Sequence, residues 1–243
     1  MITLYNLDCM EYMRTLPDKA FDLAIVDPPY GMGSVTYMPR TRKKAHGGFI
    51  DSYDITIATI DNNQRSNIKT AVCHSQSNGN KHFGDENVSP SPEYFDELFR
   101  VSSHQIIWGG NYFLLPPTRG FICWRKTTVA ETFSMAMCEY AWTSFNVNAK
   151  YFECAPQGNA KDPRIHPTQK PVALYKWLLQ RYAKPGWSIL DTHLGSGSIA
   201  IACHDDGFDL TGCEIDQDYF AAAQKRLETH QKQMTFEFQE ALL

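Results

Sequence analysis

The chain has 243 residues, 43% of them hydrophobic, and a net charge of −4. This is enough for one α/β domain with a sizeable core. No apolar run approaches the roughly 20 residues that cross a bilayer, and the N-terminus lacks a charged segment followed by an apolar one, so we expect a soluble, cytoplasmic protein with no membrane association.

Residues 1–26 are predicted to form a strand, a helix and a second strand. The second strand covers the apolar run 21–26, which is typical of a buried strand in a parallel sheet. It leads directly into Asp27-Pro28-Pro29-Tyr30. Because ligands of open α/β sheets bind beyond the carboxyl ends of the strands, we expect chemistry at this tetrapeptide.

The tetrapeptide suits a substrate with an exocyclic amine on a flat heteroaromatic ring. The lone pair of such an amine is delocalised, and two acceptors aimed at its N–H bonds push electron density back onto nitrogen. Asp27 supplies a carboxylate and Pro28 a carbonyl group, and the proline rings hold both in place. Tyr30 offers a ring face for stacking. The alternative interpretation is a strand-ending turn, in which Pro-Pro is common.

Residues 31–90 are rich in Ser, Asn, Thr, Gly and Gln and break the pattern of strands and helices. A structureless insertion of this length is unusual in a compact domain, so we interpret it as a mobile loop that holds part of a target-recognition surface. An insertion without a role is the alternative. Its basic cluster is predicted to contact nucleic-acid phosphates, although a solvated loop would have the same composition. The cluster comprises Arg40, Arg42, Lys43 and Lys44.

Regular elements resume at Ser91. The sequence predicts a helix from Pro92, strands near 104–108, 120–125 and 137–143, a second polar loop over 144–166, and helices over 171–182 and 216–232. Seven scattered cysteines without a C-x-x-C pair predict reduced thiols, and we expect no metal site.

A second motif begins after the predicted strand 187–190. Asp191 opens a turn that contains Gly195 and Gly197, and a helix follows, so a ligand can approach the backbone closely. Glu214 and Asp216 follow the next strand, where an acidic residue suits two ribose hydroxyls. These features predict a nucleoside-cofactor site. The glycine spacing also fits a dinucleotide site, but a carboxylate before the glycines suits a cationic amino group better than a pyrophosphate.

The set of motifs resembles the S-adenosylmethionine-dependent DNA amino-methyltransferases of the circularly permuted β-type. The catalytic tetrapeptide comes first, and the segment 166–171 (His-Pro-Thr-Gln-Lys-Pro) precedes the cofactor loop. Residues 6–9 and 106–113 are also similar to family segments. The resemblance implies one methyltransferase domain over 1–243 with the class I fold, a doubly wound and mostly parallel sheet with helices on both faces.

Carried over, the resemblance assigns the catalytic role to Asp27, Pro28, Pro29 and Tyr30. It assigns cofactor binding to Asp8, Thr168, Lys170, Asp191, Gly195, Gly197, Ser198, Glu214 and Asp216. Two departures stand in the cofactor loop. Thr192-His193 replaces the usual Pro-Phe, and Ser198 replaces the usual Thr.

The resemblance implies methyl transfer from S-adenosylmethionine to the N6 amine of adenine in double-stranded DNA, with S-adenosylhomocysteine as product. The leading Asp27 favours adenine, because cytosine-N4 enzymes more often carry Ser there. Methylation of RNA or a protein amide, and a DNA-binding subunit without catalysis, are the alternatives. The recognition sequence and the pairing with a restriction enzyme stay open. No separate recognition domain is evident, so we expect a short recognition sequence, or a homodimer partner that contributes to recognising it.

Overall fold

The computed structural model describes residues 1–31, 89–133, 135–156 and 164–240, with side chains described to residue 233. The chain divides into one compact unit, Met1–Gly31 with Val88–Leu243, and a second unit, Met32–Asn87. The second unit lies outside the described residues. The predicted recognition loop over 31–90, apart from its ends, and the basic cluster therefore lie outside them too.

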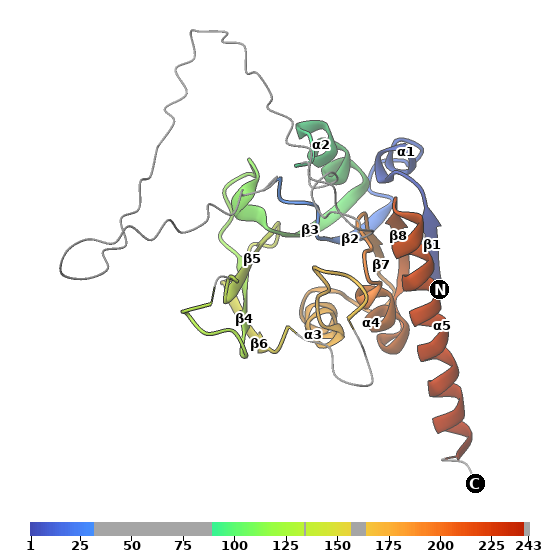
Figure 1. Cartoon of the computed structure of the whole chain (residues 1–243). Helices are drawn as coiled ribbons and strands as arrows, with labels where there is room; N and C mark the ends of the chain where they lie inside the picture. Colours follow the sequence, from blue (N-terminus) through green and yellow to red (C-terminus); the bar gives the residue numbers. More distant parts are fainter. Residues whose placement is uncertain (32–88, 134, 157–163, 241–243) are drawn as a thin grey trace, which may run out of the picture. The chain divides into compact units, whose positions relative to one another are not determined.

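In the described part of the chain, eight strands form one sheet in the order β1-β8-β7-β2-β3-β5-β4-β6 (Figure 1). Neighbouring strands are parallel, except that β5 runs antiparallel to both β3 and β4. The strands are β1 (Ile2–Asn6), β2 (Phe21–Val26), β3 (Ser102–Trp108), β4 (Phe121–Lys126), β5 (Cys138–Thr143), β6 (Lys150–Cys154), β7 (Ser188–Asp191) and β8 (Asp209–Glu214).

Helices cover both faces of this sheet. The helices are α1 (Cys9–Arg14), α2 (Pro92–Val101), the 3-10 turn η1 (Gly110–Tyr112), α3 (Val172–Tyr182), α4 (Ser198–Asp206) and α5 (Gln217–Glu240). Figure 1 shows α1 and α2 on one side of the strands, and α3 and α4 on the other. One core contains residues of α3, α4 and α5, and the other contains residues of α1 and α2. The prediction of a doubly wound, mostly parallel sheet is confirmed.

The central strand β2 shows why its sequence is so uniformly apolar. Successive side chains of a strand point to opposite faces. Leu23 and Ile25 accordingly belong to the core beneath α3 and α4, whereas Ala24 and Val26 belong to the core beneath α1 and α2. All four are at most 1% exposed. A strand buried on both faces does not alternate between apolar and polar residues. The continuous apolar run made β2 recognisable in the sequence.

The predicted polar loop over 144–166 is wrong in part, because it contains strand β6. This strand lies at the edge of the sheet and pairs only with β4 in the described structure. Its Lys150, Tyr151 and Glu153 are exposed, so the segment reads as polar. Phe152 anchors it, with its ring 5.0 Å from that of Trp177. Residues 157–163 lie outside the described part.

The last helix is also longer than predicted. Helix α5 continues past residue 232 to Glu240. Residues 229–233 are all polar, so the sequence pattern ended the helix too early. None of the described helices is long and apolar enough to cross a membrane.

Candidate active site

Two carboxylates from adjacent strands meet at one edge of the sheet. Asp27 follows β2, and Asp191 is the last residue of β7. The two strands are parallel neighbours, with Leu23 opposite Ile189 and Ala24 opposite Leu190. The catalytic tetrapeptide and the glycine turn, whose leading residues Asp27 and Asp191 are 164 positions apart in the chain, therefore open on the same edge, as the sequence predicts.

Both carboxylate oxygens of Asp27 have a donor. The hydroxyl group of Tyr30 donates to Oδ1 at 2.8 Å, and Nζ of Lys170 contacts Oδ2. Burial, reinforced by the charge of Asp27, raises the pKa of Tyr30 far above its usual value, so the phenol remains a donor. The Tyr30 ring stacks on that of Tyr112 at 5.0 Å and 20°. The tetrapeptide is therefore a fixed acceptor beside an aromatic stack.

Gly109 makes room for this stack. It has a φ of +67°, a conformation that L side chains rarely adopt. A Cβ atom at this position would lie 2.2 Å from Cε1 of Tyr30, which is far too close. The residue following strand β3 must therefore be glycine for Tyr30 to take its observed place.

Replacing Gly109 by alanine should destabilise the fold by more than the roughly 1–2 kcal/mol of left-handed backbone strain, because Tyr30 must also move. Gly186→Ala is the matched control. Gly186 has a φ of +83°, but nothing lies within 4 Å of its would-be Cβ. Urea unfolding of both variants gives the comparison. Equal losses of stability would show that Tyr30 does not need the space at Gly109.

Asp191 is the most buried acid of the site. It is 2% exposed, and its Oδ1 accepts a hydrogen bond from the His193 amide at 3.0 Å. Burial, with repulsion from Asp27 and Glu214, raises the pKa of Asp191 to about 8. A buried carboxyl group with a raised pKa is a suitable partner for a cationic group of a ligand, because the cation offsets the cost of its buried negative charge.

Glu214 ties the glycine turn to the end of β8. Its Oε2 accepts from the Gly195 amide at 2.7 Å, and its Oε1 from the Asp216 amide at 2.9 Å. Burial raises its pKa, and the charge of Asp216 adds to this. Asp216 itself accepts from the amides of Asp218 and Tyr219 at 2.8 and 3.0 Å, so its carboxylate caps α5.

The segment around residue 166 lies against the glycine turn, as the sequence leads us to expect. Cε1 of His166 is 3.5 Å from the point that a Cβ of Gly195 would occupy. Thr168 stays beside it, with its hydroxyl oxygen 3.1 Å from Nδ1 of His166. The ammonium group of Lys170 contacts the catalytic turn instead. It lies between Asp27 and Glu139, 3.2 Å from Oε2 of Glu139.

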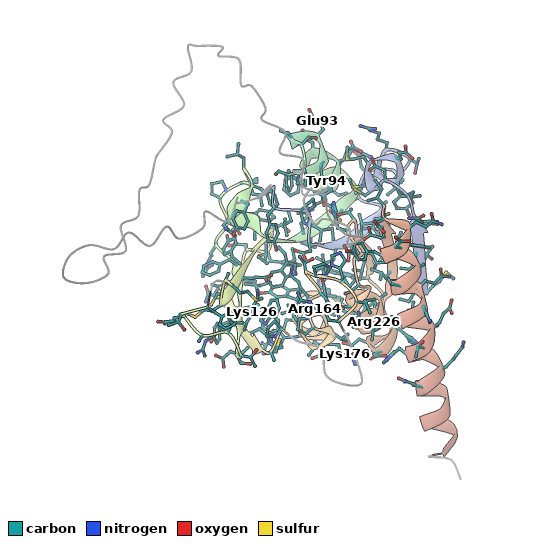
Figure 2. All side chains as sticks on the ribbon, in the orientation of Figure 1. Glu93, Tyr94, Lys126, Arg164, Lys176 and Arg226 are labelled. Atoms are coloured by element: carbon teal, nitrogen blue, oxygen red, sulfur yellow. The ribbon has the colours of Figure 1, made fainter. Side chains whose placement is uncertain are left out.

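Two other predicted cofactor residues have structural partners. The Ser198 hydroxyl group accepts from Arg226 at 3.0 Å and lies 3.1 Å from the Ser196 hydroxyl oxygen (Figure 2 labels Arg226 on α5). Asp8 caps α1 by accepting from the Met10 amide at 2.8 Å, at the exposed end of β1. Gly197 begins α4 with a φ of +70°.

Several residues of the site escaped the sequence analysis. Tyr94 of α2 (labelled in Figure 2) forms a 2.6 Å hydrogen bond with the Thr192 hydroxyl group. Its ring also packs edge-on against His193 at 5.4 Å. Burial lowers the pKa of His193 to about 4, so this ring is neutral and packs as an aromatic group in the cofactor turn. Nothing in the sequence marked Glu139 as a site residue, because a single acidic residue in a core strand belongs to no recognisable motif.

A separate hollow of about 760 Å³ lies where β3 begins, at the edge of the sheet opposite Asp27. It is lined by aromatic rings such as Trp177 and Trp187 and by basic side chains such as Lys184. No carboxylate is among its described lining residues, so it offers no charged acceptor for an amine. We therefore place the candidate active site at the Asp27 edge.

The mostly parallel doubly wound sheet, with an acidic Pro-Pro turn beside a glycine turn, agrees with the class I methyltransferase fold that the family resemblance implies. Residues 103–225 match the N6/N4 methyltransferase family, described as DNA methylase, and the chain belongs to this family.

Two curated relatives are similar over most of the chain. The putative methylase YubD of Escherichia coli (strain K12) is 26% identical over 245 residues, covering 93% of this chain and 90% of that protein. The type II methyltransferase M.HinfI of Haemophilus influenzae is 24% identical over 255 residues, covering 93% and 68%.

Two solved structures share the fold. M1.HpyAVI aligns with a TM-score of 0.51 at 19% identity, covering 93% of this chain and 98% of that one. The cytosine-N4-specific PvuII DNA methyltransferase aligns with a TM-score of 0.54 at 12% identity, covering 93% and 86%.

Proposed function

We propose that the protein transfers a methyl group from S-adenosylmethionine to the N6 amine of adenine in double-stranded DNA, in a site-specific manner. Membership of the N6/N4 family supports methylation of a base amine in DNA. The observation that carries the proposal is the Asp27 carboxylate, held at both oxygens by Tyr30 and Lys170 beside the Asp191 edge.

The residues present fit the proposed cofactor. Asp191 is a buried carboxyl group suited to a cationic amino group, and Glu214, 9% exposed, stands at a strand end suited to ribose hydroxyls. Gly195 and Gly197 let a ligand approach the turn between them. M1.HpyAVI, which shares the fold, has been solved as a complex with S-adenosylmethionine. When bound, the cofactor supplies an electrophilic methyl group.

The chain itself supplies acceptors and stacking surfaces. Asp27 accepts one N–H of the target amine and the Pro28 carbonyl group accepts the other, which localises the lone pair on nitrogen for in-line attack. Tyr30 and Tyr112 form the aromatic stack beside these acceptors. The base must leave the duplex to reach them, at a cost of roughly a few kcal/mol. The amine loses its proton after transfer, so no strong base is required.

Asp27, the first residue of the tetrapeptide, supports adenine as the target base. The fold shared with the cytosine-N4-specific PvuII enzyme makes methylation of cytosine N4 the alternative that the experiment must exclude. Tritiated cofactor should label duplex DNA, with ribosomal RNA and a release-factor protein tested in parallel. Mass analysis of nucleosides from the labelled DNA should show N6-methyladenine. N4-methylcytosine, or label only in RNA or protein, would contradict the proposal.

The basic cluster Arg40, Arg42, Lys43 and Lys44 is proposed to contact DNA phosphates. Changing all four to glutamine should reduce the slope of log affinity against log salt by about 0.9 for each phosphate that the variant no longer neutralises. Fluorescence anisotropy of a labelled duplex at several salt concentrations measures this slope. Lys225→Gln with Lys232→Gln, two exposed lysines of α5, is the matched control. An unchanged slope in the quadruple variant would remove the cluster from the interface.

A further inference from the structure

Four charged side chains of alternating sign lead from the interior to the candidate active site. Nζ of Lys126 lies 2.6 Å from Oε1 of Glu139, Oε2 of Glu139 lies 3.2 Å from Nζ of Lys170, and Lys170 contacts Asp27. Figure 2 marks Lys126 at the β4 side of the sheet. The side chains of Lys170 and Lys126 are only 3% and 8% exposed. Their charges are thus satisfied mainly by the two acids.

The sheet topology brings these residues together. Lys126 ends β4 and Asp27 follows β2, so both lie at the carboxyl edge of the parallel strands. Because β5 is antiparallel, its beginning, with Glu139, lies at the same edge. Lys170 arrives from the segment before α3. Its Nζ also lies 5.1 Å from the centre of the Trp108 ring, which favours a cation at this place.

Opposite charges favour the ionised forms of Glu139 and Lys170 in this buried place. Burial pushes the pKa of Glu139 upward, but Lys170 and Lys126 outweigh it and hold this pKa below its usual value. Burial pushes the pKa of Lys170 downward, but Asp27 and Glu139 outweigh it and raise this pKa. An ion pair this well buried is stable only when every member has an opposite charge beside it.

A lysine in contact with the catalytic carboxylate has two opposing effects. It holds the Asp27 carboxylate in place, but it also draws off the negative charge that the target amine must feel. Glu139 relieves the second effect, because it shares the ammonium group. Its Oε2 lies 3.2 Å from the Lys170 ammonium nitrogen, so Glu139 takes part of that charge. The ammonium charge is thus divided between two acids.

We propose that Lys170 is a positioning residue that holds the Asp27 carboxylate aligned for the target amine, and that Glu139, fixed by Lys126, limits how far Lys170 neutralises it. This inference rests on the proposed function and deepens it. It moves Lys170 from the cofactor, where the family resemblance placed it, to the acceptor.

The experiment compares kcat and KM of the full-length protein for duplex DNA and S-adenosylmethionine. Lys170→Met should lower kcat by a factor on the order of 10², because a displaced acceptor misaligns the target amine, and should leave both KM values unchanged. Lys170→Arg should restore most of kcat. Glu139→Gln should also lower kcat, because Lys170 then draws more charge from Asp27.

Calorimetry with S-adenosylmethionine separates the two roles of Lys170. If Lys170 acts through Asp27, its replacement should change the cofactor Kd by less than about threefold, well under the factor of ten that corresponds to 1.4 kcal/mol. Lys176→Met is the matched control, since it removes another lysine–aspartate pair, the 2.6 Å contact of Lys176 of α3 with Asp205 of α4. Figure 2 labels Lys176. The control should leave both kcat and the Kd unchanged.

The outcomes are distinguishable. An active wild type whose Lys170→Met variant keeps its kcat, or binds cofactor tenfold more weakly, overturns this inference alone. A wild type that binds cofactor but methylates no DNA overturns the proposed function and this inference with it. If Lys170→Met does not fold, judged by its thermal transition, Glu139→Gln decides, and an unchanged kcat in that variant overturns the inference.

Discussion

Replacing Asp27 by alanine should lower the rate constant of methyl transfer by a factor on the order of 10²–10³, the effect of removing one preorganised group that stabilises developing charge. The target amine would lose one of its two acceptors, and Lys170 would lose a partner of opposite charge. Single-turnover quench-flow with labelled cofactor measures the chemical step without product release. The cofactor Kd should change little, because Asp191 and Glu214 stand on other strands.

Asp27→Asn is the informative companion. Its amide oxygen still accepts one hydrogen bond, but its charge is gone and its NH₂ group faces the ammonium of Lys170. The rate should therefore fall between those of the wild type and Asp27→Ala. Near-wild-type turnover of Asp27→Ala would show that the carboxylate does not activate the amine.

The second large effect concerns Asp191 and cofactor affinity. Asp191→Asn should weaken S-adenosylmethionine binding by about 30-fold or more, since losing one member of a buried charge pair costs roughly 2–5 kcal/mol. The charge matters here more than the hydrogen bond, because the side-chain amide oxygen of this variant could still accept from the His193 amide. Isothermal titration calorimetry gives the Kd of both proteins.

Asp191 also predicts a pH dependence. With its pKa raised to about 8 in the free protein, this carboxyl group is mostly protonated at pH 7 and must lose a proton to face a cation. Affinity should therefore rise from pH 6 to pH 8, by about tenfold per unit at first and then less steeply. Binding at pH 7 should release close to one proton, which calorimetry in buffers of different ionisation enthalpy detects. If the cofactor affinity of the wild type changed as little with pH as that of Asp191→Asn, the result would contradict the proposed role of Asp191 in binding the cofactor.

The fold was predictable where local sequence and burial agree. Strand β2 is apolar on both faces, and two prolines mark the turn after it, so both the strand and the turn could be predicted. The edge strand β6 was missed because Lys150 and Tyr151 face solvent there and leave only Phe152 and Cys154 to pack against the core.

The candidate site was predictable to the level of motifs but not of contacts. Asp27 and Asp191 could be placed together because parallel strands end at one edge. Glu139 could not, since its place beside Lys170 depends on β5 being antiparallel. Likewise, a motif names Ser198 but does not say that its hydroxyl group binds Arg226.

The most direct test of the proposed chemistry is a crystal structure of the protein with a duplex carrying its target sequence and a non-transferable analogue of S-adenosylmethionine. It should show an adenine outside the helix, with its N6 atom about 2.7–3.2 Å from both an Asp27 carboxylate oxygen and the Pro28 carbonyl oxygen. A bound base whose amine points away from these two oxygens, or a cytosine in their place, would contradict it.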